Sequence, residues 1–186
     1  SMRRFSTRKS GEVLMKMVEN QVKPSQIMTK NALENTVTLL SALGGSLNAM
    51  IHLPALAAEL GLSLTWEEIA KITSKTPVLT AIVPNGDETV VDLHFAGGVP
   101  AVMKELAPVL HLEEKAADGR TWREVLAETE DGDRTTIHTM ADPISRADGI
   151  QVLYGNLAPD GALVKTSAVP EDYRVFTGTA KVFDSE

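Results

Sequence analysis

The sequence predicts an α+β protein whose helices come first and whose strands come last. Apolar residues recur at helical spacing through about the first two thirds of the chain, between capping residues and glycine stops. After about residue 134 the segments become short, rich in β-branched residues, and separated by glycine, proline and aspartate. Helices and strands do not alternate regularly, which argues against a parallel α/β sheet.

We place a boundary between a mostly helical part at residues 1–135 and a β-rich part at residues 136–186. The chain has 186 residues, of which 43% are hydrophobic, so it is long enough to build a core. The second part alone is near the lower size limit for independent stability and would leave an unpaired sheet edge. We therefore expect the chain to be a piece of a longer protein.

The first helices are predicted from their ends. The basic stretch at 2–9 is interpreted as a frayed arm. A helix is expected to begin at Asn31, where Glu34 gives capping-box spacing, and to stop at the glycine pair 44–45. A second helix is expected over residues 47–60, capped by Ser46 and stopped by a glycine, with a kink or a restart at Pro54.

Two further capping boxes predict short helices, one at residues 65–68 and one at residues 121–124. Residues 90–106 look like a helix, a glycine joint and a second helix with proline in its first turn. The segment 77–84 could be a short strand or an extended linker, ended by a turn at Asn85-Gly86.

The β-rich part is predicted from four segments that resemble strands joined by turns: TTIHTM, GIQVLYG, GALVKTSAV and GTAKVFDS. The turn formers in Tyr154–Gly161 predict a hairpin connection between the second and third of these segments.

Composition excludes several classes of protein. The formal net charge of −7 gives no general attraction to nucleic acid. No apolar run reaches the roughly 20 residues that cross a bilayer, so we expect no membrane partner and a cytoplasmic location. The chain has no cysteine, which excludes disulfides, thiol nucleophiles and cysteine-held metal clusters within it. The four histidines show no ligand spacing, and we assign no metal ligand and no catalytic residue.

The Gly44-Gly45-Ser46 joint is the main candidate site. It could present backbone N–H groups to an anion at a helix N-terminus, or it could be a helix–helix turn in which glycines permit close packing. His52 could point back to the same helix end or into the core. We take Gly45, Ser46, Asn48 and His52 as candidate substrate-binding residues.

Several stretches, taken together, resemble one enzyme family. Residues 33–35, 42–49 and 52–53 resemble its FENA…ALGGSTNAV…HL run. The other matches follow in the family's order: 96–104 (AGG(I/V)PAVMK), 119–121 (GKTL) and 153–162 with Lys165 (GNLAPxGAxxK). The family is that of dihydroxy-acid, phosphogluconate and sugar-acid dehydratases. Its members are roughly three times this length, so the chain resembles their middle segment: the end of an N-terminal α/β domain and the opening strands of a β-barrel-like domain.

The resemblance implies dehydration of a 2,3-dihydroxy acid to a 2-keto acid. In the family an iron–sulfur cluster acts on the departing 3-hydroxyl, Mg²⁺ binds the carboxylate end, and a serine takes the C2 proton. The cluster cysteines, most magnesium ligands and that serine belong to family segments that have no counterpart here. Leu47 stands where the family usually has threonine, which leaves open whether a dihydroxy acid or a sugar acid is the substrate.

Two hypotheses for function follow. In the first, the chain is a fragment of such a hydro-lyase, inactive alone and prone to self-association or a homodimer, because it exposes apolar surface. In the second, it is a stand-alone binding or assembly module that kept the scaffold and lost the chemistry. A reading frame that extends upstream into cysteine motifs would favour the first, whereas a native start near Met2 and a stop after Glu186 would favour the second.

Overall fold

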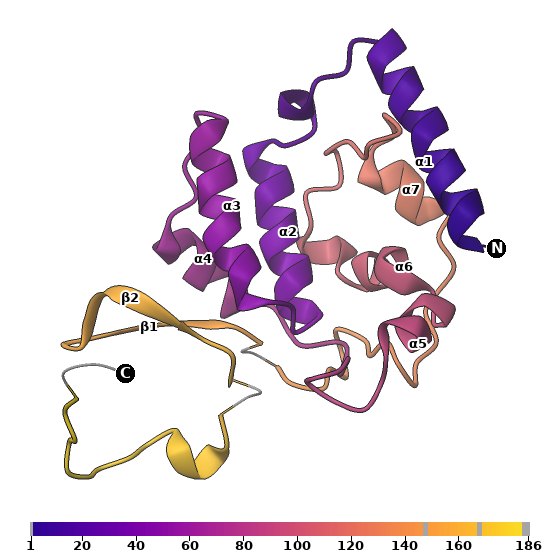
Figure 1. Ribbon diagram of the computed structural model, residues 1–186. Coiled ribbons are helices and arrows are strands. Elements are labelled where there is room, and N and C mark those ends of the chain that lie inside the picture. Colours follow the sequence, from indigo (N-terminus) through magenta and orange to yellow (C-terminus); the bar gives the residue numbers. More distant parts are fainter. Residues whose placement is uncertain (1, 147–148, 167–168, 184–186) are drawn as a thin grey trace.

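The computed structural model describes residues 2–146, 149–166 and 169–183. In these ranges seven α-helices precede one β-hairpin, which confirms the predicted α+β class (Figure 1). The helices are α1 (Met2–Glu19), α2 (Lys30–Ala42), α3 (Leu47–Glu59), α4 (Trp66–Thr73), α5 (Val90–Phe95), α6 (Gly98–Glu105) and α7 (Trp122–Ala127), and the strands are β1 (Gln151–Gly155) and β2 (Ala158–Val164). Short 3-10 turns lie at Pro24–Gln26, Ala107–Val109 and Glu171–Tyr173.

Helix α2 is the central element and separates two apolar clusters. In Figure 1, α3 and α4 lie on one side of it, and α5, α6 and α7 lie on the other. The first cluster joins the face of α2 that carries Val37 to Met50 of α3 and Ile69 of α4. The second cluster packs α6 and the extended segment that carries Leu79 around the C-terminal end of α2. The 0% exposure of Val37, Met50, Ile69 and Leu79 shows how completely both clusters exclude water.

The predicted helix ends are largely confirmed. Ser46 caps α3, and the boxes at residues 65–68 and 121–124 cap α4 and α7. The predicted start of α2 was wrong, because Thr29 is the N-cap and its hydroxyl oxygen accepts from the Ala32 N–H at 3.1 Å. The Thr29 hydroxyl also donates to Glu114 at 2.5 Å, and the Asn31 amide donates to the same carboxylate. A local sequence pattern cannot predict Glu114 as a partner, because it lies 85 residues from Thr29 along the chain.

The N-terminal stretch is a helix rather than the frayed arm that the sequence predicted. Arg8 and Lys9 both pair with Glu12 one turn later, and such pairs stabilise a helix with few tertiary contacts. The helix packs sparsely: Leu14 is 58% exposed, and Val13 and Met17 are half-buried. Among the described helices none is both long and apolar enough to cross a membrane.

The sequence predicted a kink or a restart of the helix at Pro54, and the restart does not occur. Residues 47–59 form one helix through it. Leu53 and Ala57, on either side of the proline, are both buried in the cluster with α2 and α4. Tertiary packing therefore offsets the hydrogen bond that proline cannot donate.

The β-rich part holds fewer strands than predicted. GIQVLYG and the first part of GALVKTSAV form the antiparallel hairpin, with Gln151 opposite Val164 and a register shift before Gly155. Residues 135–140 form turns, bends and irregular chain, and residues 178–183 form no strand. The ends of GALVKTSAV (167–168) and GTAKVFDS (184–185) lie outside the described residues. The segment 77–84 is an extended linker with isolated bridges.

The missing strand at residues 135–140 has a physical explanation. Ile137 is 0% exposed and packs into the cluster around α6, while the His138 N–H donates to the Leu79 carbonyl at 2.9 Å. The β-branched side chain thus fills a core site, and no neighbouring strand is present in the described chain to pair with this segment. β-propensity reports how well a residue suits a paired, half-buried surface, so it misleads where pairing does not occur.

The capping boxes make the stability of the fold dependent on pH. The Lys30 ammonium and then the Thr65 backbone N–H lower the pKa of Glu68 below its ordinary 4.5. A carboxylate whose pKa is lowered in the folded state stabilises that state above the unfolded pKa, and the contribution is lost as pH falls through the folded pKa. We expect the Tm to fall below about pH 4.5, and we expect Glu68→Gln to make that fall shallower in a series of thermal melts from neutral to acidic pH.

Glu67→Gln is the matched control for this prediction. Glu67 lies in the same first turn of α4, is exposed, and accepts no hydrogen bond from the described residues. Its substitution should leave the pH dependence of the Tm unchanged. Equal effects of the two substitutions would contradict the role assigned to Glu68.

Candidate functional site

The glycine joint between α2 and α3 is the centre of the candidate site. Gly44 has φ +59°, a left-handed conformation that disfavours other residues, and it follows the last turn of α2. The Gly45 N–H donates to the Leu40 carbonyl at 2.8 Å, and the Ser46 hydroxyl oxygen accepts from the Asn48 N–H at 3.2 Å. The joint is thus a helix–helix turn, one of the two alternatives that the sequence left open. The same turn presents the N-terminus of α3 to a hollow.

The segment 79–85 holds this joint in place. Helices end with carbonyls that have no intrahelical partner, and here three of them in succession find partners on the segment. The Leu79 N–H donates to the Ala42 carbonyl at 2.8 Å, the Thr80 hydroxyl to the next carbonyl at 3.5 Å, and the Asn85 amide to the Gly44 carbonyl at 2.5 Å. The end of α2 is therefore satisfied by a distant part of the chain.

A hollow of about 470 Å³ opens at the joint, and we call it the joint hollow. Its lining comes from the joint, from the segment that leads into α5, and from the residue after β2: Leu43, Gly44, Gly45, Ser46, Leu47, Ile82, Val83, Asn85, Val90, Leu93 and Lys165. The volume is within the range of small-molecule sites, about 300–1,000 Å³. Mostly apolar walls with a few polar groups are also typical of such sites.

Lys165 decides the electrostatics of the joint hollow. It is half-buried and is the one ionisable side chain among the described residues that line the hollow. No carboxylate of the described chain pairs with it within 4.0 Å. The Ser46 hydroxyl, the Asn85 amide and the N-terminus of α3 add polarity on the other side. The arrangement suits a small anion with an apolar portion.

The structure brings together some of the candidate residues and not others. Gly45 and Ser46 both line the joint hollow. Asn48 is exposed in the first turn of α3, and His52 is exposed one turn later, so neither lines the hollow or enters the core. The inward orientation considered for His52 is therefore not the one adopted.

Asn85 and Lys165 are the polar residues of this hollow that sequence reasoning did not select. In the sequence, Asn85 belongs to a predicted turn, and Lys165 ends a stretch that resembles a family motif. Residue spacing does not predict the hydrogen bond from Asn85 to the Gly44 carbonyl, because the two residues are 41 positions apart along the chain. For Lys165 a sequence signal was available, because it ends a stretch that resembles a family motif. It also follows directly after a predicted strand.

The residues of this chain do not fit the metal cofactors that the resemblance implies. A cluster held by thiolates needs cysteine, and the sequence has none. Within the described ranges, no three histidine, aspartate or glutamate side chains gather as a cation site. Asp131 instead pairs with Lys104, and Asp133 accepts a hydrogen bond from the Thr135 backbone N–H.

Comparison with known proteins gives the class of this chain. Residues 1–125 match the family model described as dihydroxy-acid/6-phosphogluconate dehydratase N-terminal. Residues 135–186 match the model described as dihydroxy-acid/6-phosphogluconate dehydratase C-terminal. The helical part and the hairpin part therefore match the N-terminal and C-terminal models of one class of dehydratases. The position of the predicted boundary at 135/136 stays a prediction.

The chain belongs to the dihydroxy-acid/6-phosphogluconate dehydratase family. It is 46% identical over 179 residues to the dihydroxy-acid dehydratase of Ruminiclostridium cellulolyticum, an alignment that covers 95% of this chain and 32% of that protein. It is 45% identical over 181 residues to that of Acetivibrio thermocellus, with 96% and 33% covered. For Aquifex aeolicus the identity is 38% over 186 residues, with 99% and 34% covered. The chain thus spans about a third of the length of these curated relatives.

Proposed function

We propose that this chain supplies scaffold and part of the substrate pocket to a hydro-lyase that converts a 2,3-dihydroxy acid into a 2-keto acid. The observation that carries the proposal is the match of both family models, in order, to residues 1–125 and 135–186. In this reaction the C3–OH bond breaks, C2 loses its proton, and the resulting enol tautomerises to the ketone, with one water released. Hydroxide leaves poorly and the C2 proton is weakly acidic, so both steps require stabilisation of developing charge.

In the proposal, the joint hollow receives the acid. The Lys165 ammonium would bind the carboxylate, because it is half-buried and lacks a carboxylate partner in the described chain. Gly45 and Ser46 would let the substrate approach the start of α3, and the apolar walls that include Leu47 would exclude water. Asn48 and His52 do not line the joint hollow, and they stay proposed contacts for a part of the substrate that extends out of it along α3.

No reaction step is assigned to a metal on this chain, because its described residues do not fit an Fe–S cluster or Mg²⁺. The Fe–S cluster and Mg²⁺ that the resemblance implies would be held by other segments of a longer dehydratase. The chain alone is accordingly expected to form no 2-keto acid from 2,3-dihydroxyisovalerate. Formation of 2-keto acid by the purified chain would contradict this expectation.

A chimera tests the proposal. Residues 9–186 would replace the homologous third of the Ruminiclostridium cellulolyticum enzyme, and 2-keto acid formation from 2,3-dihydroxyisovalerate would be measured. We expect an active chimera in which Lys165→Met lowers kcat/KM by about tenfold or more, since a charge-assisted contact of about 1.5–3 kcal/mol is lost.

The exposed Lys115 provides the matched control, because Lys115→Met removes the same charge at a place far from the joint hollow. Equal activity of the Lys165→Met and parent chimeras would rule out the role of Lys165. A folded but inactive parent chimera would instead favour a non-catalytic binding or assembly module.

A further inference from the structure

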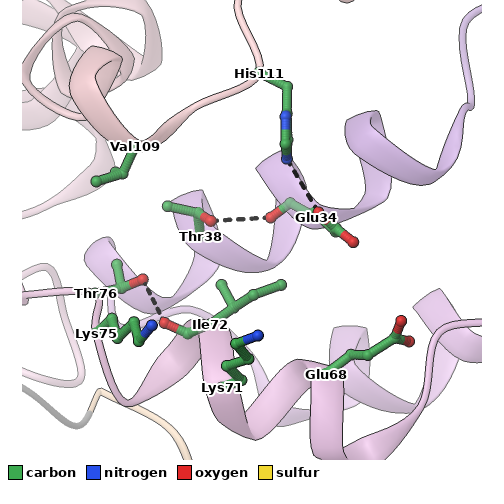
Figure 2. A pocket seen from close by; sticks show the side chains of 9 residues that line it. All are labelled: Glu34, Thr38, Glu68, Lys71, Ile72, Lys75, Thr76, Val109 and His111. Atoms are coloured by element: carbon green, nitrogen blue, oxygen red, sulfur yellow. Dashed lines mark hydrogen bonds and ion pairs between the residues drawn. The ribbon is translucent and has the colours of Figure 1, made fainter.

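A second hollow, of about 340 Å³, lies between α2, α4 and the segment 109–111, and we call it the lysine hollow. Figure 2 shows its lining side chains: Glu34, Thr38, Glu68, Lys71, Ile72, Lys75, Thr76, Val109 and His111. It shares no lining residue with the joint hollow. Because α2 rises about 1.5 Å per residue, its two lining residues Thr38 and Glu34 lie about 9 Å and about 15 Å along the helix from Gly44. The lysine hollow is therefore a separate place in the fold.

The two carboxylates of the lysine hollow already have hydrogen-bond or ion-pair partners. Glu34 contacts the His111 ring nitrogen Nε2 at 3.0 Å, and the Lys30 ammonium lies 3.8 Å from it. Glu68 accepts from Lys30 at 2.6 Å and from the Thr65 backbone N–H at 2.7 Å. Neither carboxylate depends on the remaining lysines for a partner.

Lys71 and Lys75 are the two exposed lysines of the lysine hollow. Neither ammonium group has a hydrogen bond or an ion pair with any residue that the structure describes. In Figure 2 their side chains lie on either side of Ile72. Two cations four residues apart repel each other weakly when exposed, and an anion between them relieves that repulsion. With Lys30, three lysines face two glutamates around the lysine hollow, and this net positive charge favours an anionic ligand.

The remaining lining selects the rest of the ligand. The Thr38 hydroxyl donates to the Glu34 carbonyl at 3.0 Å, and the Thr76 hydroxyl donates to the Ile72 carbonyl at 2.8 Å. Both hydroxyl protons are thus committed, and the hydroxyls have no proton to offer an anion. Val109 is 50% exposed and, with the half-buried Ile72, gives the hollow an apolar surface. An anion with an apolar tail matches these walls better than a small inorganic anion does.

We propose that the lysine hollow binds a short-chain organic monocarboxylate, with its carboxylate between Lys71 and Lys75 and its apolar tail on Ile72 and Val109. The site is additional to the joint hollow and does not depend on the function proposed for that hollow. Its ligand would lie against α2 beside Thr38 (Figure 2).

An NMR titration of the ¹⁵N-labelled chain with butanoate tests the proposal. We expect saturable shifts at the amides of the lining residues, including Ile72, Thr76 and His111. Two partly exposed ion pairs together correspond to about a tenfold effect, so Lys71→Gln/Lys75→Gln should weaken butanoate binding by about tenfold. The Lys71→Arg/Lys75→Arg chain should retain binding.

The controls separate charge, apolar contact and location. Lys23→Gln/Lys115→Gln removes two exposed charges elsewhere and should leave the butanoate affinity unchanged. Butan-1-ol, which lacks the charge, should bind at least about tenfold more weakly than butanoate. Phosphate binding as tight as butanoate would overturn the role of the apolar surface. Unchanged butanoate binding in the Gln pair, or no saturable shift at the lining amides, would overturn the site.

Discussion

Leu79→Ala is expected to lower the free energy of unfolding by about 2–5 kcal/mol, the range for truncating a buried leucine. Leu79 is 0% exposed within the cluster around α6. Its N–H donates to the Ala42 carbonyl and its carbonyl accepts from the His138 N–H. The substitution would therefore leave a cavity at the point where α2, the linker 77–84 and the segment after α7 meet. Denaturant unfolding followed by circular dichroism measures the change.

Two further substitutions make this prediction specific. Leu79→Met nearly conserves volume and should cost less than about 1.5 kcal/mol. Ile51→Ala removes an aliphatic side chain that is 60% exposed on α3 and should change stability by less than about 0.5 kcal/mol. A loss for Leu79→Ala no larger than for Ile51→Ala would contradict the packing described here.

Gly44→Ala is expected to lower the free energy of unfolding by about 2–3 kcal/mol, from two causes that add. Gly44 has φ +59°, where a Cβ is strained by about 1–2 kcal/mol. The new Cβ would also lie 2.5 Å from the Asn85 amide nitrogen, which donates to the Gly44 carbonyl. The amide would have to move and lose that hydrogen bond, worth about 1 kcal/mol. Thermal or denaturant unfolding measures the loss.

Gly61→Ala separates the two causes. Gly61 has φ +70°, yet a Cβ there would meet no atom within 4 Å, so its substitution carries backbone strain alone. Gly44→Ala should therefore cost more than Gly61→Ala. In Gly44→Ala/Asn85→Ala the collision is absent, and the loss should be smaller than the sum of the two single losses. Strict additivity would show that Asn85 is not the group displaced.

The glycine joint connects stability to the proposed function. Gly44, Gly45, Ser46 and Asn85 all line the joint hollow, and Asn85 also holds the end of α2. A substitution that displaces Asn85 would alter the shape of the hollow as well as the stability of the fold. The lysine hollow has no lining residue in common with it and should keep its affinity for butanoate in the Gly44→Ala chain.

The sequence by itself determined the features whose cause is local. Thr65 with Glu68, Thr121 with Glu124, and Ser46 are caps within a few residues of the groups they satisfy, so their spacing predicts them. The turn between β1 and β2 was predicted for the same reason. The order of the glycine and proline motifs also identified the family, since several matches in order are specific even where one is not.

The tertiary structure alone decided the features whose partner is distant in the chain. Thr29 became the cap of α2 beside Glu114, Ile137 entered the core instead of a strand, and Lys165 came to face the glycine joint. Short-range patterns report what a segment can form, whereas burial and long-range hydrogen bonds select which of those options lowers the free energy most. The joint hollow and the lysine hollow both consist of side chains gathered in this way, so neither could be predicted from residue spacing.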